Sequence, residues 1–385
     1  MLKTLSGDVN SDLKYGLSGL ATAPIGYLVL LFLPVYLEVI GSHLSLNEQQ
    51  IGWLASTDSV GLALATLLFS IFIKRLNFRK VVLTGVIITV IGNLLSALTQ
   101  DFLLLCLVRS VTGFGEGLIV AVGISSIGMT SKPNRWFGFY TAAIVAVQAL
   151  GLLVVPIIYD HLSFSGVFIS MAVFYLIPLV VMKILPSKSD DYHLNKGDEF
   201  PTFKQSKRLF NLALLGLLFF YMSIGGVWTY ISFMGTNAGL TLTFVSRALA
   251  LTMIAGLVGA LIFAIIGKLA KKIGLLFFSL LAMSLSLWGV NSEITETRYL
   301  VALCVFSFFW SIAGARLFAV ISDVDHSGKY ISAAQTVVGV GYIFGPILAS
   351  TLVSGISYTN VILMGSVLFS LCFIFILPLA RLRPI

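Results

Sequence analysis

The chain has 385 residues, of which 58% are hydrophobic and only 10% are charged, and its formal net charge is +8. A soluble domain carries about 25% charged residues, so this composition excludes the soluble globular class. The three cysteines all lie in apolar stretches, which favours neither a disulfide framework nor a metal site.

Apolar stretches of about 20 residues recur along the chain, and each can cross ~30 Å of hydrocarbon. Backbone polar groups must be satisfied within the lipid, so we expect helices. The sequence therefore predicts an all-α integral membrane protein. Its twelve expected helices are 15–39, 51–73, 81–99, 102–124, 137–159, 165–185, 209–233, 243–266, 274–291, 299–320, 330–355 and 360–380.

The basic residues are distributed unevenly about these helices. All but four of the 24 Lys and Arg residues fall on one side of the expected membrane; the exceptions are Arg109, Arg247, Arg298 and Arg316. Positive residues stay in the cytoplasm, so both termini are predicted to be cytoplasmic, in a plasma membrane of the bacterial inner-membrane kind. The excess charge therefore indicates topology, with anionic headgroups as a second interpretation, and nucleic acid is not an expected partner.

Two stretches half a chain apart resemble each other. One set of residues recurs in the same order 190 positions later: Gly138, Tyr140, Ala143, Gly151, Pro156 and Ile157 match Gly328, Tyr330, Ala333, Gly341, Pro346 and Ile347. Such repeats are typical of secondary transporters, whose site lies between the halves. We expect pseudo-symmetric six-helix bundles at 1–185 and 209–385, joined by a polar cytoplasmic linker at 186–208.

Two short motifs occur in the corresponding helices and loops of a known family, and a third, which its antiporters usually have on the fifth helix, occurs on the eleventh. The loop after the second helix, 70–79, reads SIFIKRLNFR; the fourth helix has RSVTGFG at 109–115; the eleventh has GYIFGP at 341–346. With six plus six helices and a central loop, nearly the whole chain resembles the major facilitator superfamily. The departures are Lys74, where the family usually has Asp, and Asn77, where Gly is usual. Asn tolerates a left-handed backbone better than most residues.

The resemblance implies secondary active transport by alternating access. It assigns gating roles to the basic loop residues Arg75 and Arg79 and to their second-half counterparts Lys268 and Lys271. It also associates Arg109 with proton-coupled transport.

Ionisable residues within the expected helices are the best indicators of a functional site, because burying them in lipid is costly. Asp58 lies roughly 10 Å and Arg109 roughly 12 Å from the same side, at 1.5 Å per residue. Glu116 follows two turns after Arg109, on nearly the same face. We expect Arg109 within salt-bridge reach of Asp58 or Glu116. The pair is either structural, fixing helix register, or functional, with Asp58 titrating, Arg109 exchanging partners and Glu116 as the next candidate.

Arg316 on the tenth helix lies at a depth similar to that of Glu116. One interpretation pairs these two residues. The other, which is slightly favoured, pairs Arg316 with Asp323 or Asp325, or places its head group at the interface.

Polar and aromatic side chains supply further candidates for a substrate cavity: Gln148, Tyr221, Trp310 and Gln335. We expect Asn93 to pack peripherally and Trp228 to anchor the membrane interface. The pair Gly225–Gly226 predicts a bend in the seventh helix.

The chain lacks a phosphate-binding loop of the G-x-x-x-x-G-K-[ST] type, so ATP-driven transport is not expected. The leading hypothesis is a monomeric, proton-coupled transporter of a small organic solute, without catalytic residues, metal or cofactor. A small anion, a zwitterion or a lipophilic compound fits better than a sugar. The alternatives are a polytopic enzyme acting on lipid and a non-transporting receptor of the same fold.

The topology can be tested by cysteine labelling. In a variant with Cys106, Cys304 and Cys372 replaced, single cysteines at Ser45 and Ser189 should react with an impermeant maleimide from opposite sides of the membrane. Reaction of both from the same side would contradict the arrangement.

Overall fold

The structure is a computed structural model that describes residues 2–130, 133–187, 207–266, 273–290, 294–324, 329–353 and 357–381. The predicted linker therefore lies almost entirely outside the described residues, as do Lys268 and Lys271.

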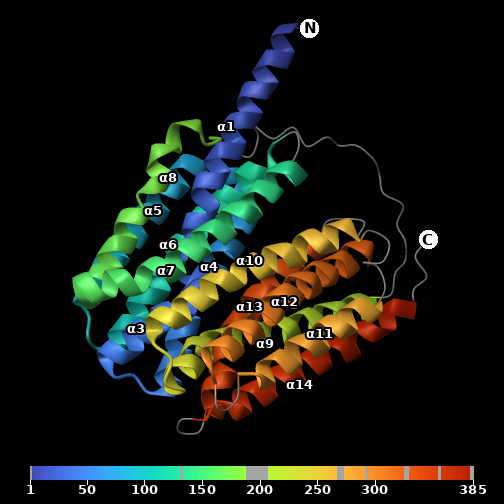
Figure 1. Cartoon of the computed structure of the whole chain (residues 1–385). Helices are drawn as coiled ribbons and strands as arrows, with labels where there is room; N and C mark the ends of the chain where they lie inside the picture. The colour runs from blue at the N-terminus through green and yellow to red at the C-terminus, as the bar shows by residue number, and fades with distance from the viewer. Residues whose placement is uncertain are drawn as a thin grey trace. The chain divides into compact units, whose positions relative to one another are not determined.

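Helices account for the described fold, and no strand is assigned in these ranges (Figure 1). The longer helices are α1 (Leu2–Gly26), α3 (Leu33–Leu44), α4 (Glu48–Phe72), α5 (Phe78–Leu98), α6 (Phe102–Gly128), α7 (Pro133–Phe174), α9 (Lys207–Asn237), α10 (Leu242–Ile265), α11 (Ile273–Trp288), α12 (Glu296–Val324), α13 (Lys329–Leu352) and α14 (Thr359–Ile376). Short elements are α2 (Leu28–Leu31), η1 (Ile73–Arg75), α8 (Ile177–Val180), η2 (Met182–Ile184) and η5 (Leu377–Arg381).

These helices confirm the predicted all-α membrane fold. Eight stretches are long and apolar enough to cross a membrane, and one of them, Arg135–Ile184, holds two predicted crossings. The chain reverses within it at Ser163, whose φ of 59° and ψ of −169° interrupt α7. The first predicted helix is divided into α1, α2 and α3 by breaks at Tyr27 and Phe32. Two shorter apolar helices, Ile273–Trp288 and Thr336–Leu352, complete the set of twelve predicted segments.

Polar side chains at the membrane borders fix where several helices begin. Asp101 accepts a hydrogen bond from the backbone N–H of Leu104, which caps α6. Asn77 caps α5 in the same way through the N–H of Lys80. The backbone of Asn77 is extended, with a φ of −91° and a ψ of 112°, so the left-handed conformation that Asn tolerates is not used there.

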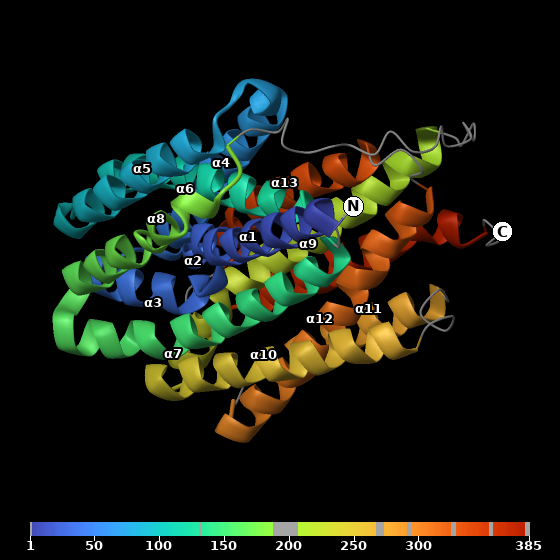
Figure 2. The same cartoon turned by 90° about the horizontal axis from the view of Figure 1, so that it is seen from above.

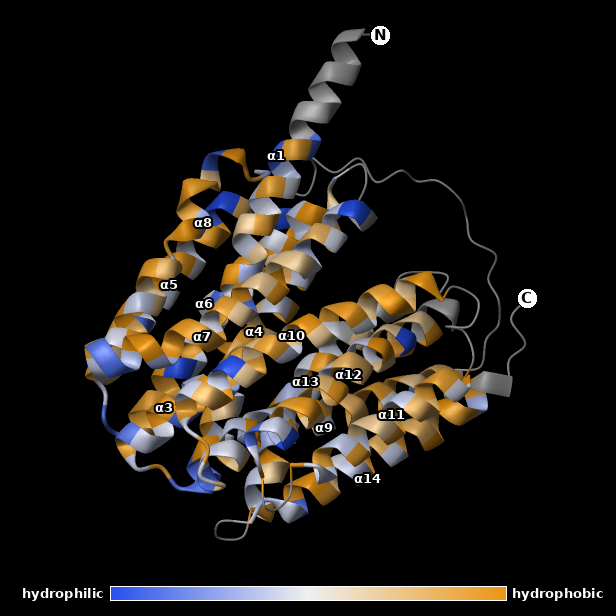
Figure 3. Cartoon of the chain, viewed as in Figure 1, coloured by the Kyte–Doolittle hydropathy of each residue, from blue (hydrophilic) through white to orange (hydrophobic). Residues whose placement is uncertain are grey.

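The chain forms two compact units. One comprises Met1–Leu44 with Thr57–Lys196, and the other comprises Ser45–Ser56 with Gly197–Ile385. In the first, α6 packs against α1 and α5; in the second, α9 packs against α13 and α14, and α12 against α10 and α11 (Figures 1 and 2). Apolar residues cover most of the length of the helices, and hydrophilic residues gather mainly at helix ends and loops (Figure 3).

Small residues let α4 and α6 approach closely. A Cβ added at Gly113 would lie 2.2 Å from the carbonyl oxygen of Asp58, and one at Gly61 would lie 2.0 Å from that of Ser110. One turn after Gly113, a Cβ at Gly117 would lie 2.5 Å from the carbonyl oxygen of Leu62. Backbone contact through a small-xxx-small stripe is the usual device for packing helices in lipid. Here it brings Asp58 and Arg109 onto facing turns.

Glycines play the same part between α9 and α13. A Cβ at Gly345 would lie 2.3 Å from the carbonyl oxygen of Met222, and one at Gly226 would lie 2.8 Å from that of Gly345. Helix α9 runs from Lys207 to Asn237 without a break at Gly225–Gly226, and the bend expected there stays a prediction. These glycines make room for α13.

Gly113→Ala should destabilise the protein by about 1–3 kcal/mol, because the new methyl group meets backbone rather than a movable side chain. The matched control is Gly128→Ala on the same helix, where a Cβ would have nothing within 4 Å. Thermal unfolding in detergent should show a lower midpoint for the first variant and an unchanged or slightly raised midpoint for the second. Equal midpoints would refute the close contact.

Candidate functional site

A buried arginine lies at the centre of the first unit. The Nε of Arg109 donates to Oδ2 of Asp58 at 3.2 Å, and its Nη2 donates to Oδ1 of the same carboxylate at 2.5 Å. Nη2 also lies 3.1 Å from Oε1 of Glu116. The three side chains are 0%, 1% and 0% exposed for Arg109, Asp58 and Glu116. The predicted salt-bridge reach is therefore confirmed, for both acids at once.

The two acids are held differently. Both oxygens of Asp58 accept from Arg109, which is the forked geometry that guanidinium and carboxylate prefer. In Glu116, Oε1 accepts from Arg109 and also from the hydroxyl of Tyr175 at 2.7 Å. Its other oxygen, Oε2, is buried and has no hydrogen-bond partner among the described residues.

Asn93 on α5 completes the polar contacts of the arginine. Its Oδ1 accepts from Nη1 of Arg109 at 3.1 Å, and its Nδ2 donates to the carbonyl of Thr89 at 2.7 Å. The expectation that Asn93 packs peripherally is wrong: its side chain is fully buried. The bond to Thr89 fixes which end of the amide faces Arg109.

Aromatic rings enclose the guanidinium. The Cζ of Arg109 lies 5.8 Å from the ring centroid of Tyr36 on α3 and 5.9 Å from that of Phe168 on α7. Cation–π attraction strengthens when the cation is desolvated, as it is here. The sequence analysis did not identify Tyr36, Phe168 or Tyr175, because nothing in a single sequence shows which of many membrane aromatics face one arginine.

The site does not balance its charges. Two carboxylates and one guanidinium leave one negative charge if both acids are ionised, and a charge without a partner is expensive in a dry interior. One added proton makes the group neutral. The arrangement can therefore hold and release a proton with a change in its net charge.

The second unit carries a cluster of half-buried aromatic side chains. The ring of Tyr221 on α9 lies 5.6 Å from that of Tyr342 on α13 and 6.4 Å from that of Phe318 on α12. Trp310 on α12 lies 5.6 Å from Trp228 on α9. Tyr221 and Trp310 were predicted, whereas Tyr342 and Phe318 were missed. Trp228 is 3% exposed, so its predicted role as an interfacial anchor is wrong.

The other predicted site residues are dispersed. Gln148 is half-buried on α7 of the first unit, and Arg316 is buried on α12 of the second. The side chains of Gln335, Asp323 and Asp325 lie outside the described residues, so the proposed Asp partners of Arg316 are not placed. Glu116 makes its contacts within its own unit, to Arg109 and Tyr175.

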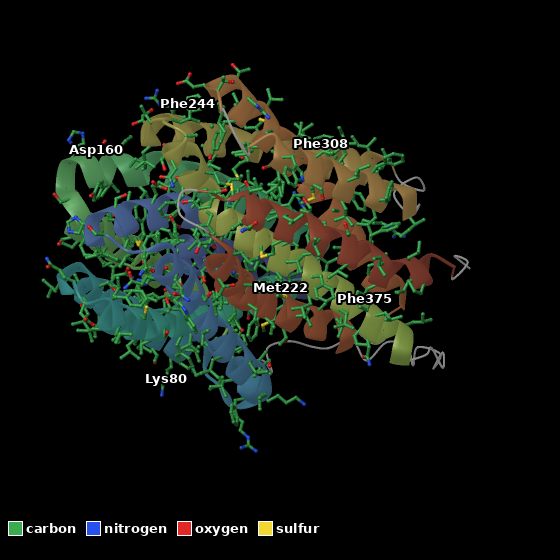
Figure 4. The ribbon with its side chains drawn as sticks, turned by 90° about the horizontal axis from the view of Figure 1, so that it is seen from below. Lys80, Asp160, Met222, Phe244, Phe308 and Phe375 are labelled. Atoms are coloured by element: carbon green, nitrogen blue, oxygen red, sulfur yellow. The ribbon has the colours of Figure 1, made fainter. Side chains whose placement is uncertain are left out.

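The loop after α4 is tied to the end of the sixth predicted helix. Nε of Arg79 donates to the carbonyl of Leu185 and Nη2 donates to that of Lys183, both at 3.0 Å. Arg75 is exposed at the end of η1. The nearby Lys80 points away from the ribbon (Figure 4). The gating role of Arg75 and Arg79 stays a prediction.

Comparison with known proteins places these observations in a family. The family model described as Major Facilitator Superfamily matches residues 18–323. The uncharacterized MFS-type transporter YceJ of Bacillus subtilis (strain 168) is 23% identical over 231 residues, which is 58% of each chain. The putative transporter AraJ of Escherichia coli (strain K12) is 21% identical over 251 residues, covering 64% of this chain and 62% of AraJ. The match thus spans about three fifths of these relatives.

Solved structures share the fold at low identity. A D-xylose-proton symporter matches with a TM-score of 0.76 and 14% identity over 98% of this chain and 100% of its own. The nucleoside transporter NupG matches with a TM-score of 0.71 and 13% identity over 97% of this chain and 100% of its own.

Arg109→Gln should destabilise the protein by about 3–5 kcal/mol, because it leaves two buried carboxylates without their cation. Adding Asp58→Asn should restore part of the loss, since one of those charges is then removed. The control is the exposed Arg75→Gln, which should change stability by less than about 0.5 kcal/mol. Thermal unfolding in detergent is the measurement, and additive effects of the two buried substitutions would contradict the coupling.

Proposed function

The chain belongs to the major facilitator superfamily of secondary transporters, and we propose that it moves a small organic solute by alternating access, coupled to a proton at the Arg109 site. The observation that carries this proposal is the buried group of two carboxylates and one guanidinium in membrane-spanning helices. Charges are retained at such depth chiefly where they serve transport or a proton relay.

A proton-dependent switch needs two arrangements of similar free energy. Without the proton, both carboxylates of the site compete for the guanidinium of Arg109. With the proton, one acid is neutral and the remaining pair is balanced. Each state favours a different set of hydrogen bonds, so proton binding at this site biases the packing of α4 against α6. The close glycine contacts between those helices transmit small displacements, because backbone meets backbone there.

The substrate side of the proposal rests on half-buried groups. In the second unit Tyr221 and Trp310 present aromatic faces, and in the first Gln148 offers an amide. The buried Arg316 and the Gln335 position are further candidates on α12 and α13. Aromatic faces suit apolar or planar groups. A small organic anion, a zwitterion or a lipophilic compound therefore fits better than a polyhydroxylated sugar.

The nucleoside transporter, the D-xylose-proton symporter and the proton-dependent oligopeptide transporters that share this fold are named for different solutes, so the likeness does not select one substrate. The chain is a multi-pass membrane protein. We place it in a bacterial inner membrane with cytoplasmic termini, as a monomer acting on a small molecule without a cofactor. Arg75, Arg79, Lys268 and Lys271 remain the proposed gating positions.

Transport in proteoliposomes tests the proposal. A panel of labelled anions, zwitterions, lipophilic compounds, a nucleoside, D-xylose and a dipeptide is first screened for thermal stabilisation of the detergent-solubilised protein. The stabilising solute should then accumulate above equilibrium when a pH gradient is imposed, and should exchange without one.

Asp58→Asn should abolish this uphill accumulation and keep exchange, because the site is then neutral without a proton: the remaining Glu116 alone balances Arg109. Arg247→Gln, at an exposed position on α10, is the control for reconstitution. Uphill accumulation by Asp58→Asn equal to that of the parent would contradict coupling at this site, and conversion of the solute to a product would favour an enzyme.

A further inference from the structure

We propose that Glu116, rather than Asp58, is the acid that carries the proton, that the proton resides on its Oε2, and that Tyr175 positions this carboxyl. The inference deepens the proposed function and rests on it for its role in transport. The sequence alone favoured Asp58, because Asp58 lies at the depth of Arg109. The geometry distinguishes the two acids.

The hydrogen bonds of the two carboxyls leave room for a proton on only one of them. Protonating either oxygen of Asp58 would disrupt a bond from Arg109, since Oδ1 accepts from Nη2 and Oδ2 from Nε. In Glu116 both bonds converge on Oε1, from Arg109 and Tyr175. Oε2 accepts none among the described residues, so a proton can bind there without breaking a hydrogen bond.

The cost of desolvating a charged oxygen also favours Glu116 over Asp58 as the protonated acid. A buried oxygen that bears negative charge and has no donor is costly, whereas a neutral carboxyl oxygen in the same place costs much less. Asp58 shares a forked pair with the arginine and keeps its charge balanced. The single proton that neutralises the site therefore belongs on the acid with the unsatisfied oxygen.

The groups that face Glu116 come from four directions. Arg109 lies on its own helix α6 at 3.1 Å, Asp58 approaches from α4 through the shared arginine, and Tyr175 follows the end of α7. Tyr36 on α3 lies over Arg109, and its hydroxyl has no hydrogen-bond partner among the described residues. Two more helices pack against α6: α5 contributes the uncharged Asn93, which contacts Arg109, and α1 brings Gly26 against the carbonyl oxygen of Glu116.

Proton release then changes the site in a defined way. The O–H bond at Oε2 breaks, the proton passes to water, and the electron pair stays on the carboxylate. The site gains one negative charge, and Glu116 now competes with Asp58 for the guanidinium. Tyr175 donates to Oε1 in both states, but its bond is stronger to the charged form. Removing that donor should therefore make the carboxyl hold its proton to higher pH.

Infrared spectroscopy of the unmodified protein tests the assignment without any substrate. Protein is produced with 13C in the side-chain carboxyl of Glu only, or of Asp only, and the C=O stretch of protonated carboxyls is followed from mildly acidic to alkaline pH. We expect a band from a buried protonated carboxyl. Its frequency should shift with labelled Glu and not with labelled Asp, and the band should be absent from Glu116→Gln. A band at this site that shifts with labelled Asp, or no such band at any pH, would overturn the proposal.

Tyr175→Phe separates positioning from mere packing. It should raise the C=O stretching frequency of protonated Glu116. It should also move the midpoint of the band's titration up by about one pH unit, the size expected for one lost hydrogen bond to a charged group. The matched control is Tyr36→Phe, which removes an equally buried hydroxyl that has no hydrogen-bond partner in the described part of the chain. This control should leave the titration midpoint of the Glu116 band unchanged, and equal shifts of that midpoint in both variants would refute the positioning role.

The spectra also separate this inference from the proposed function. A Glu116 band in a protein that moves no protons in liposomes would uphold the assignment and refute the coupling. Proton-driven transport together with a band that shifts with labelled Asp would uphold the coupling and refute the assignment to Glu116.

Discussion

One buried guanidinium shared by two carboxylates is the interaction on which the first unit depends. Arg109 binds Asp58 through Nε and Nη2, reaches Glu116 through the same Nη2 and binds Asn93 through Nη1. Its side chain thereby ties α4, α5 and α6 together, and the end of α7 joins them through the bond from Tyr175 to Glu116. In lipid this matters more than in water, because apolar surfaces gain little by leaving hydrocarbon for each other.

Close backbone packing is the condition that makes this interaction possible. The carboxylate of Asp58 reaches Arg109 because Gly113 and Gly61 remove the side chains that would separate α4 from α6. The same device recurs in the second unit, where Gly226 and Gly345 bring α9 and α13 together. Each unit thus combines a lipid-facing apolar surface with an interior that is close-packed around small residues. Larger residues at these points would move the charges out of hydrogen-bonding distance.

The proposed function follows from an imbalance of buried charge at the Arg109 site. A site with equal numbers of buried acids and bases is already neutral and can serve as a purely structural salt bridge. The extra carboxylate leaves this site with an excess negative charge, which favours binding of a proton. In the proposed function, the unequal partners of Asp58 and Glu116 decide where that proton sits. The described neighbours of Tyr221 and Trp310 are other aromatic rings, which supports the proposal of substrate contact there.

The sequence by itself determined the membrane class, the helical segments and the candidate pair Asp58–Arg109, because hydropathy, charge bias and depth along a helix are local properties. It misjudged Asn93 and Trp228 and did not identify Tyr175, since each depends on which face of a helix meets which neighbour. Only the tertiary structure decided that Glu116 retains an oxygen without a donor among the described residues. Hydrogen bonds between distant helices are set by packing, and no periodicity in the chain records them.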